Sequence, residues 1–169
     1  MSATEHEHTF VWDGEELLPC PCGANVSAIE TLLGAAADDA RRVVGDPYYT
    51  GCRLRQELES VELWLCNAPS PVLQELEALR PGVYLIHNDA PRPESAVFEL
   101  MDALGADLST LRAEGINVVG FGPTQDGYLH VRVKGDVPTA QARLDAMYGS
   151  NVARVEYGEP ARETPRRSP

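Results

Sequence analysis

The fold is decided by the stretch INVVGFGPTQDGYLHVRV, residues 116–133. Residues 116–121 and 128–133 are rich in β-branched and apolar side chains, and the second run alternates apolar with polar residues, which predicts two strands. Asp126-Gly127 between them is typical of a tight turn. The stretch therefore predicts an antiparallel hairpin.

The elements on both sides of this hairpin complete a familiar order. Residues 93–114 and 140–148 carry apolar side chains at helical spacing, and residues 83–86 and 152–157 are short apolar runs typical of strands. The order strand, helix, strand, strand, helix, strand predicts an α+β fold with a ferredoxin-like βαββαβ sandwich. Because that architecture hosts many unrelated functions, it assigns none by itself.

The region before this core predicts a smaller lobe of helix and hairpin. Ser27 and Glu30 have the spacing of a capping box, and the apolar stripe after them predicts a helix over residues 28–44. A hairpin with its turn near Glu59 follows, and residues 61–86 predict a βαβ unit. We therefore expect four parts: a flexible arm (1–9), an N-terminal lobe (10–60), a ferredoxin-like core (61–157) and a disordered tail (158–169).

The charge balance bears on the partners that the chain can have. Its 26 acidic residues outnumber its 14 lysines and arginines, so the net charge is −12. Binding of phosphate backbones requires clustered basic residues, so we expect no nucleic-acid partner. No apolar run approaches the roughly 20 residues that cross a bilayer, so we expect no membrane span. Residues 1–9 lack the features of a signal peptide, which predicts a cytoplasmic protein as written; paired cysteines and a missing leader would place it outside the cytoplasm.

Four cysteines carry the strongest chemical signal: Cys20, Cys22, Cys52 and Cys66. One residue separates the first two, where zinc knuckles usually have two to four. Counting outward from Glu59 places Cys52 opposite Cys66, which favours a cross-strand disulfide or two buried thiols. Disulfides, free buried thiols and a single zinc site all remain open. We expect no cofactor, with zinc as the one alternative.

Motifs of catalysis are scarce. There is no GxSxG, HExxH or EF-hand spacing, and the glycine-rich residues 120–127 lack the pattern of a phosphate loop. Cys66 and His87 are expected at the ends of neighbouring strands, where a thiolate and an imidazole could form a pair. A small thiol- or zinc-dependent enzyme that uses these two residues is therefore one alternative, and an acidic structural or assembly subunit is another.

A partner surface is predicted from the strand phase. In residues 128–133, Tyr128, His130 and Arg132 alternate with the apolar set, so they share the face opposite the core if helices cover only one side of the sheet. Tyr84 is a further aromatic residue that we assign to this surface. Our leading hypothesis is a non-enzymatic protein-interaction domain that binds or inhibits a protein partner through its sheet face.

Six segments in order carry a likeness to a known family: residues 47–54, 61–65, 83–86, 115–119, 129–133 and 148–152. Over residues 47–157 the chain resembles the pro-segments of bacterial chymotrypsin-like serine proteases, and more generally it is similar to uncharacterised proteins of high-GC bacteria. The resemblance implies a protein-binding domain, because such pro-segments chaperone and inhibit their protease through the sheet and the C-terminal tail.

Overall fold

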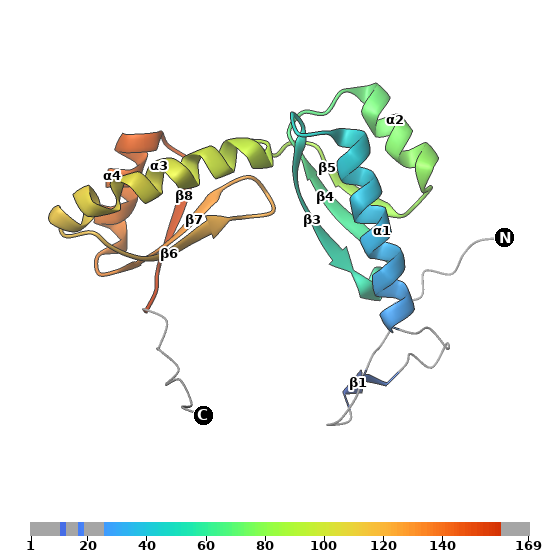
Figure 1. Ribbon diagram of the computed structural model, residues 1–169, viewed down its shortest axis with the longest axis horizontal. Helices are drawn as coiled ribbons and strands as arrows, with labels where there is room; N and C mark the ends of the chain where they lie inside the picture. The colour runs from blue at the N-terminus through green and yellow to red at the C-terminus, as the bar shows by residue number, and fades with distance from the viewer. Residues whose placement is uncertain (1–10, 13–16, 19–25, 160–169) are drawn as a thin grey trace, which may run out of the picture. The chain divides into compact units, whose positions relative to one another are not determined.

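The computed structural model describes residues 11–12, 17–18 and 26–159. The chain divides into two compact units, Met1–Pro93 and Glu94–Pro169 (Figure 1). The described residues form four α-helices and two three-stranded sheets, so the predicted α+β class with its ferredoxin-like arrangement is confirmed. Within these ranges no helix combines the length and the apolar character needed to cross a membrane. The predicted arm over residues 1–9 and the last ten residues of the predicted tail lie outside the described residues.

The first unit contains a three-stranded sheet and two α-helices. In chain order its elements are β1 (Val11–Trp12), β2 (Leu17–Leu18), α1 (Val26–Val44), β3 (Tyr49–Arg55), the 3-10 helix η1 (Gln56–Leu58), β4 (Ser60–Leu65), α2 (Ser70–Leu79) and β5 (Tyr84–His87). The sheet has the order β3-β4-β5, in which β3 and β4 are antiparallel while β4 and β5 are parallel. The predicted helix over residues 28–44 and the predicted βαβ unit over residues 61–86 are therefore confirmed.

The second unit has a sheet of its own. Its elements are α3 (Glu94–Ala113), β6 (Asn117–Pro123), β7 (Leu129–Lys134), α4 (Val137–Tyr148) and β8 (Ala153–Tyr157). The hairpin predicted from residues 116–133 is confirmed as β6 and β7, and β8 lies parallel to β7. The strand expected at residues 83–86 is β5, and it pairs with β4 instead of joining this sheet. The reason is the short crossover through α2, which returns the chain beside the strand that it has just left.

The two units repeat one arrangement. From α1 in the first unit and from α3 in the second, the helices and strands follow the order helix, strand, strand, helix, strand, with an antiparallel pair followed by a parallel pair. The first strand of each three-stranded sheet, β3 or β6, has a register shift just before a glycine. The shift lies between Tyr49 and Gly51 in β3 and between Val118 and Gly120 in β6. The shorter helices also correspond, because Leu76 of α2 and Leu144 of α4 are both fully buried.

Among the described residues, helices cover only one face of each three-stranded sheet. In the second unit, leucines of α3 and alanine and leucine of α4 enter one core cluster with alternate residues of β7, which are Leu129, Val131 and Val133. Since both helices contact the same strand phase, they lie on the same side of β6-β7-β8, as Figure 1 shows. The first unit packs α1 and α2 against Val61, Leu63 and Leu65 in the same way. The opposite face of each sheet is therefore not covered by the helices of its own unit.

Candidate functional site

The register of the first hairpin separates the two cysteines that were expected to face each other. The loop between β3 and β4 spans residues 56–59, so its centre comes before Glu59, and Cys52 lies opposite Leu63. The prediction that Cys52 faces Cys66 was therefore wrong, and both thiols are free. Cys20 and Cys22 lie outside the described residues. Among the described residues, no group of three or more potential ligands is placed to hold a metal ion.

His87 has partners other than Cys66. Its Nε2 lies 3.0 Å from Glu62 Oε1, and its ring stacks on Trp64 with 5.3 Å between ring centroids. The hydrogen bond with His87 is the main cause that lowers the pKa of Glu62. The backbone of Cys66 forms an isolated antiparallel β-bridge with Asp89, which lies two residues after His87. The imidazole that was considered for thiol chemistry is therefore engaged with a carboxylate and an indole.

Tyr84 belongs to the core of the first unit. Only 7% of it is exposed, and its hydroxyl donates a hydrogen bond of 2.9 Å to the backbone oxygen of Ala36. Burial also raises the pKa of its phenol. In register Tyr84 lies beside Val61, which points toward the helices, so its strand phase is that of the core. Its assignment to a partner surface is therefore corrected.

His130 and Arg132 lie on the uncovered side of the second sheet, in the predicted phase. Each is half-buried and alternates with fully buried residues of β7. The strand registers place Gly122 and Gly120 of β6 beside them, and Arg154 and Glu156 of β8 on their other side. We call these six residues the open face: Gly120, Gly122, His130, Arg132, Arg154 and Glu156. Across it, His130 Nε2 lies 2.9 Å from Glu156 Oε1.

Tyr128 supports one corner of the open face. The Arg154 guanidinium lies 3.5 Å from the centre of the Tyr128 ring, and the same arginine donates a 2.7 Å hydrogen bond to Asp126. Burial raises the pKa of Asp126, but hydrogen bonds from Thr124 and Arg154 outweigh this effect, so the pKa is lowered overall. The charge of Arg154 is thus already compensated by a carboxylate of the hairpin turn.

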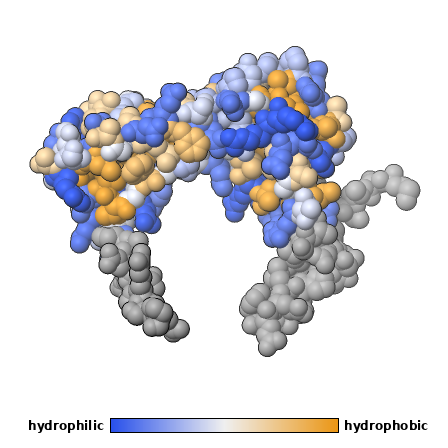
Figure 2. Space-filling model, viewed as in Figure 1, coloured by the Kyte–Doolittle hydropathy of each residue, from blue (hydrophilic) through white to orange (hydrophobic). Residues whose placement is uncertain are grey.

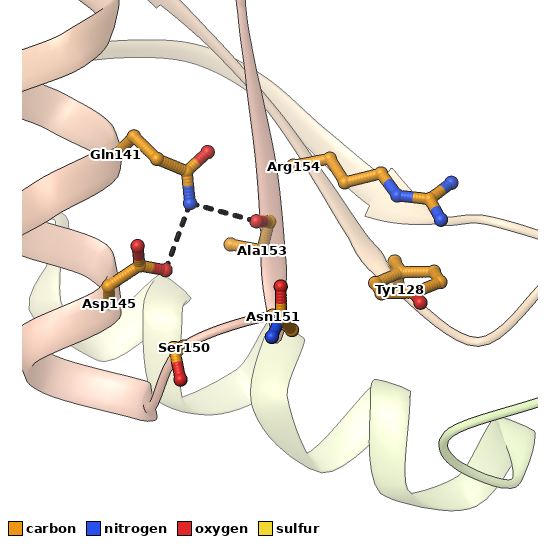
Figure 3. A pocket seen from close by; sticks show the side chains of 7 residues that line it. All are labelled: Tyr128, Gln141, Asp145, Ser150, Asn151, Ala153 and Arg154. Carbon is orange, nitrogen blue, oxygen red and sulfur yellow. Dashed lines mark hydrogen bonds between the residues drawn. The ribbon is translucent and has the colours of Figure 1, made fainter.

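The free edge of β8 is closed by a side chain. Gln141 of α4 donates from Nε2 to the backbone oxygen of Ala153 at 3.0 Å (Figure 3). Its Oε1 accepts from the backbone N–H of Val155, also at 3.0 Å, so the amide takes the place of a neighbouring strand. The same Nε2 donates to Asp145 Oδ1, also at 3.0 Å. These groups border a polar hollow of about 390 Å³, whose lining is Tyr128, Gln141, Asp145, Ser150, Asn151, Ala153 and Arg154.

Replacing Gln141 by leucine is expected to lower the free energy of unfolding by about 1–2 kcal/mol, because the edge loses its side-chain partner while the bulk of the residue is kept. Urea denaturation followed by circular dichroism measures this. Gln74→Leu on the exposed side of α2 is the matched control and should stay within about 0.5 kcal/mol of the original protein. Equal effects of the two changes would contradict the role of the amide.

A further hollow lies between α3 and the start of β6, with a volume of about 340 Å³. Its lining is Leu108, Ser109, Arg112, Ile116, Asn117 and Val118. Figure 2 shows apolar residues gathered on the surface of the second unit beside α3 and β6. This lining offers an apolar contact and brings no acid–base pair together.

Comparisons of the chain with models of protein families, with curated proteins and with solved structures gave no match. The geometry described above therefore carries the functional argument.

Proposed function

We propose that the protein is a non-enzymatic protein-interaction protein that holds a protein partner on the open face of β6-β7-β8. The observation that carries this proposal is the one-sided cover of the sheet. α3 and α4 pack on one face, while the other presents His130, Arg132 and Arg154 on neighbouring strands. Enrichment in arginine and aromatic side chains is typical of protein interfaces.

The edges of the same sheet favour docking on its face over pairing at its edge. Gln141 bonds to two outward backbone groups of β8, the oxygen of Ala153 and the N–H of Val155. On the other edge, β6 has a register shift between Val118 and Gly120 and ends in Pro123, which has no N–H to donate. Bulges, prolines and side-chain caps are devices that prevent addition of a further strand. A partner is therefore expected to contact side chains on the face instead of extending the sheet.

The resemblance to protease pro-segments supports the same class of function, since such segments bind a protein through their sheet. Inhibition of the partner is part of this proposal. The charge of the chain, −12, agrees with a protein partner better than with a polyanion.

A photo-crosslinking residue tests the proposal. With p-benzoylphenylalanine at the position of His130, irradiation of cells that make the protein is expected to yield one discrete crosslinked protein, identified by mass spectrometry. The control position is Ala142, which is exposed on α4. The proposal fails if position 130 gives no product, or if both positions give the same set of products.

A further inference from the structure

Arg132 is held in a fixed position on the open face by a glycine on each side, Gly120 of β6 and Gly158, which directly follows β8. A Cβ added at Gly158 would lie 2.7 Å from Arg132 Cβ, so the stem of the arginine occupies the space that a side chain there would need. On the other side, a Cβ at Gly120 would lie 3.5 Å from Arg132 Nε, so the guanidinium extends over this glycine. The arginine is thus preorganised on the surface of the sheet.

The guanidinium so held has no carboxylate partner within the described part of the chain. Arg80, Arg143 and Arg154 each donate to a carboxylate at 2.7 Å. Glu156 lies beside Arg132 in register, but its carboxylate is bonded to His130. Its guanidinium therefore keeps donors with which a carboxylate from a ligand can form charge-assisted hydrogen bonds.

The space around the guanidinium suits a small anionic group. Gly120, Phe121, Gly122, His130 and Arg132 line a hollow of about 280 Å³. No atom lies within 4 Å of a Cβ built at Gly122, so the floor of this hollow is open backbone. Glycines in a strand often mark a place where another chain approaches closely.

The charges around the hollow select a carboxylate over a polyphosphate. One uncompensated arginine gives a single site, whereas binding of a phosphate backbone needs several. The second unit is also the less acidic one, with 11 acidic against 8 basic residues, compared with 15 against 6 in residues 1–93. A carboxylate meets the planar fork of an arginine with two parallel hydrogen bonds.

We propose that Arg132, above Gly120 and Gly122, is a subsite for one aspartate or glutamate side chain of the protein partner. This inference rests on the proposed function, because it names the chemistry by which the open face recognises that partner. His130 is placed beside the bound carboxylate, with its Nε2 directed at Glu156.

The test uses the full chain and a synthetic peptide of alternating valine and glutamate, with the valine–glutamine peptide as its neutral counterpart. The glutamate peptide is expected to shift the NMR signals of the Arg132 Nε–H and of the Gly120 and Gly122 amides, and to bind at least about tenfold more tightly than the glutamine peptide. Raising the ionic strength from about 0.05 M to about 0.5 M should weaken its binding.

Variants of single arginines assign the effect. Arg132→Gln is expected to weaken binding of the glutamate peptide by about tenfold or more, and Arg132→Lys by less, since lysine keeps the charge but loses the fork. Arg112→Gln, at an exposed arginine of α3, should leave binding unchanged. Equal binding of the two peptides, or full binding by Arg132→Gln, overturns the subsite.

The outcomes also separate this inference from the proposed function. A crosslinked partner at position 130, together with unchanged peptide binding by Arg132→Gln, overturns the carboxylate subsite and leaves the docking face standing. If crosslinking or sedimentation shows that the occupant is a second copy of this chain, the assignment to a foreign partner is overturned. Inorganic phosphate that shifts the same signals as strongly as the glutamate peptide overturns the preference for a carboxylate.

Discussion

Replacing Leu144 by alanine is expected to lower the free energy of unfolding by about 2–5 kcal/mol. Leu144 has no exposed surface and belongs, with Leu129 and Val131 of β7, to the core that joins α4 to the sheet. Removing its branched end leaves a cavity between helix and strand in addition to the lost transfer free energy. Urea denaturation measures the loss, and hydrogen exchange should show reduced protection in β7 and β8.

The repeat supplies matched positions for this test. Leu76 of α2 corresponds to Leu144 and is equally buried, so Leu76→Ala should cost a similar amount and reduce hydrogen-exchange protection in β4. Leu79 lies in the same helix with 43% of its surface exposed, so Leu79→Ala should cost less than about 1 kcal/mol. A cost for Leu144→Ala no larger than that of Leu79→Ala would contradict the core assignment.

Part of this fold could be predicted from the sequence, and part could not. Periodicity identifies a helix or a strand and the face that it buries, so α1, α3 and the hairpin of β6 and β7 were predicted from residues alone. It does not identify all the strands that share one sheet. β5 was expected beside β4, where it lies, but it was also expected in the sheet of β6, β7 and β8, which it does not join.

An internal repeat was the signal that could have corrected the assignment of β5 to the sheet of the second unit. Leu76-Glu77-Ala78-Leu79 of α2 corresponds to Leu144-Asp145-Ala146-Met147 of α4, and a glycine follows the register shift in both first strands. Such short similarity is weak evidence by itself, but repeats of this kind are best sought before elements are joined into sheets.

The candidate site shows the same limit. Alternation along β7 correctly placed His130 and Arg132 on the face opposite the core, because the period of a strand is two. The Cys52–Cys66 pairing failed because it depended on the exact centre of a loop, and one misplaced residue shifts a whole register. Gln141 was missed because a bond from a helix side chain to a strand edge depends on packing that no local pattern encodes.

The repeat also clarifies why Arg132 has room to lie across β6. Its equivalent in the first unit is Trp64, because each of the two is paired with the glycine that follows the register shift, Gly120 or Gly51. Both positions therefore hold a large side chain opposite a glycine. Each sheet also has a histidine–glutamate pair beside this position, but the two residue types exchange strands. Glu62 of β4 is bonded to His87 of β5, whereas His130 of β7 is bonded to Glu156 of β8. One scaffold thus presents an aromatic group on one sheet and a cation on the other.

The substitution Gly158→Val is expected to destabilise the protein by about 3 kcal/mol. A Cβ at this position would lie 2.7 Å from Arg132 Cβ and 3.2 Å from Val119 Cγ2, and Arg132 Cβ cannot move away without its backbone. The N–H of Gly158 is also bonded to the backbone oxygen of Val133 at 3.0 Å, which fixes the glycine beside β7. Thermal or urea unfolding measures the effect, and Gly122→Ala, which meets no atom within 4 Å, should cost much less.

A double-mutant cycle identifies the cause of this loss. Combining Gly158→Ala with Arg132→Gly removes the closest contact, so the two changes should cost less together than the sum of their separate costs. Combining Gly158→Ala with Arg132→Ala keeps the Cβ that is approached most closely and should bring no such relief. Since Arg132→Ala also removes the guanidinium, this difference separates the steric role of the stem from the charge that we assign to binding. Relief by both combinations would mean that the far end of the arginine, instead of its Cβ, is what excludes a side chain at Gly158.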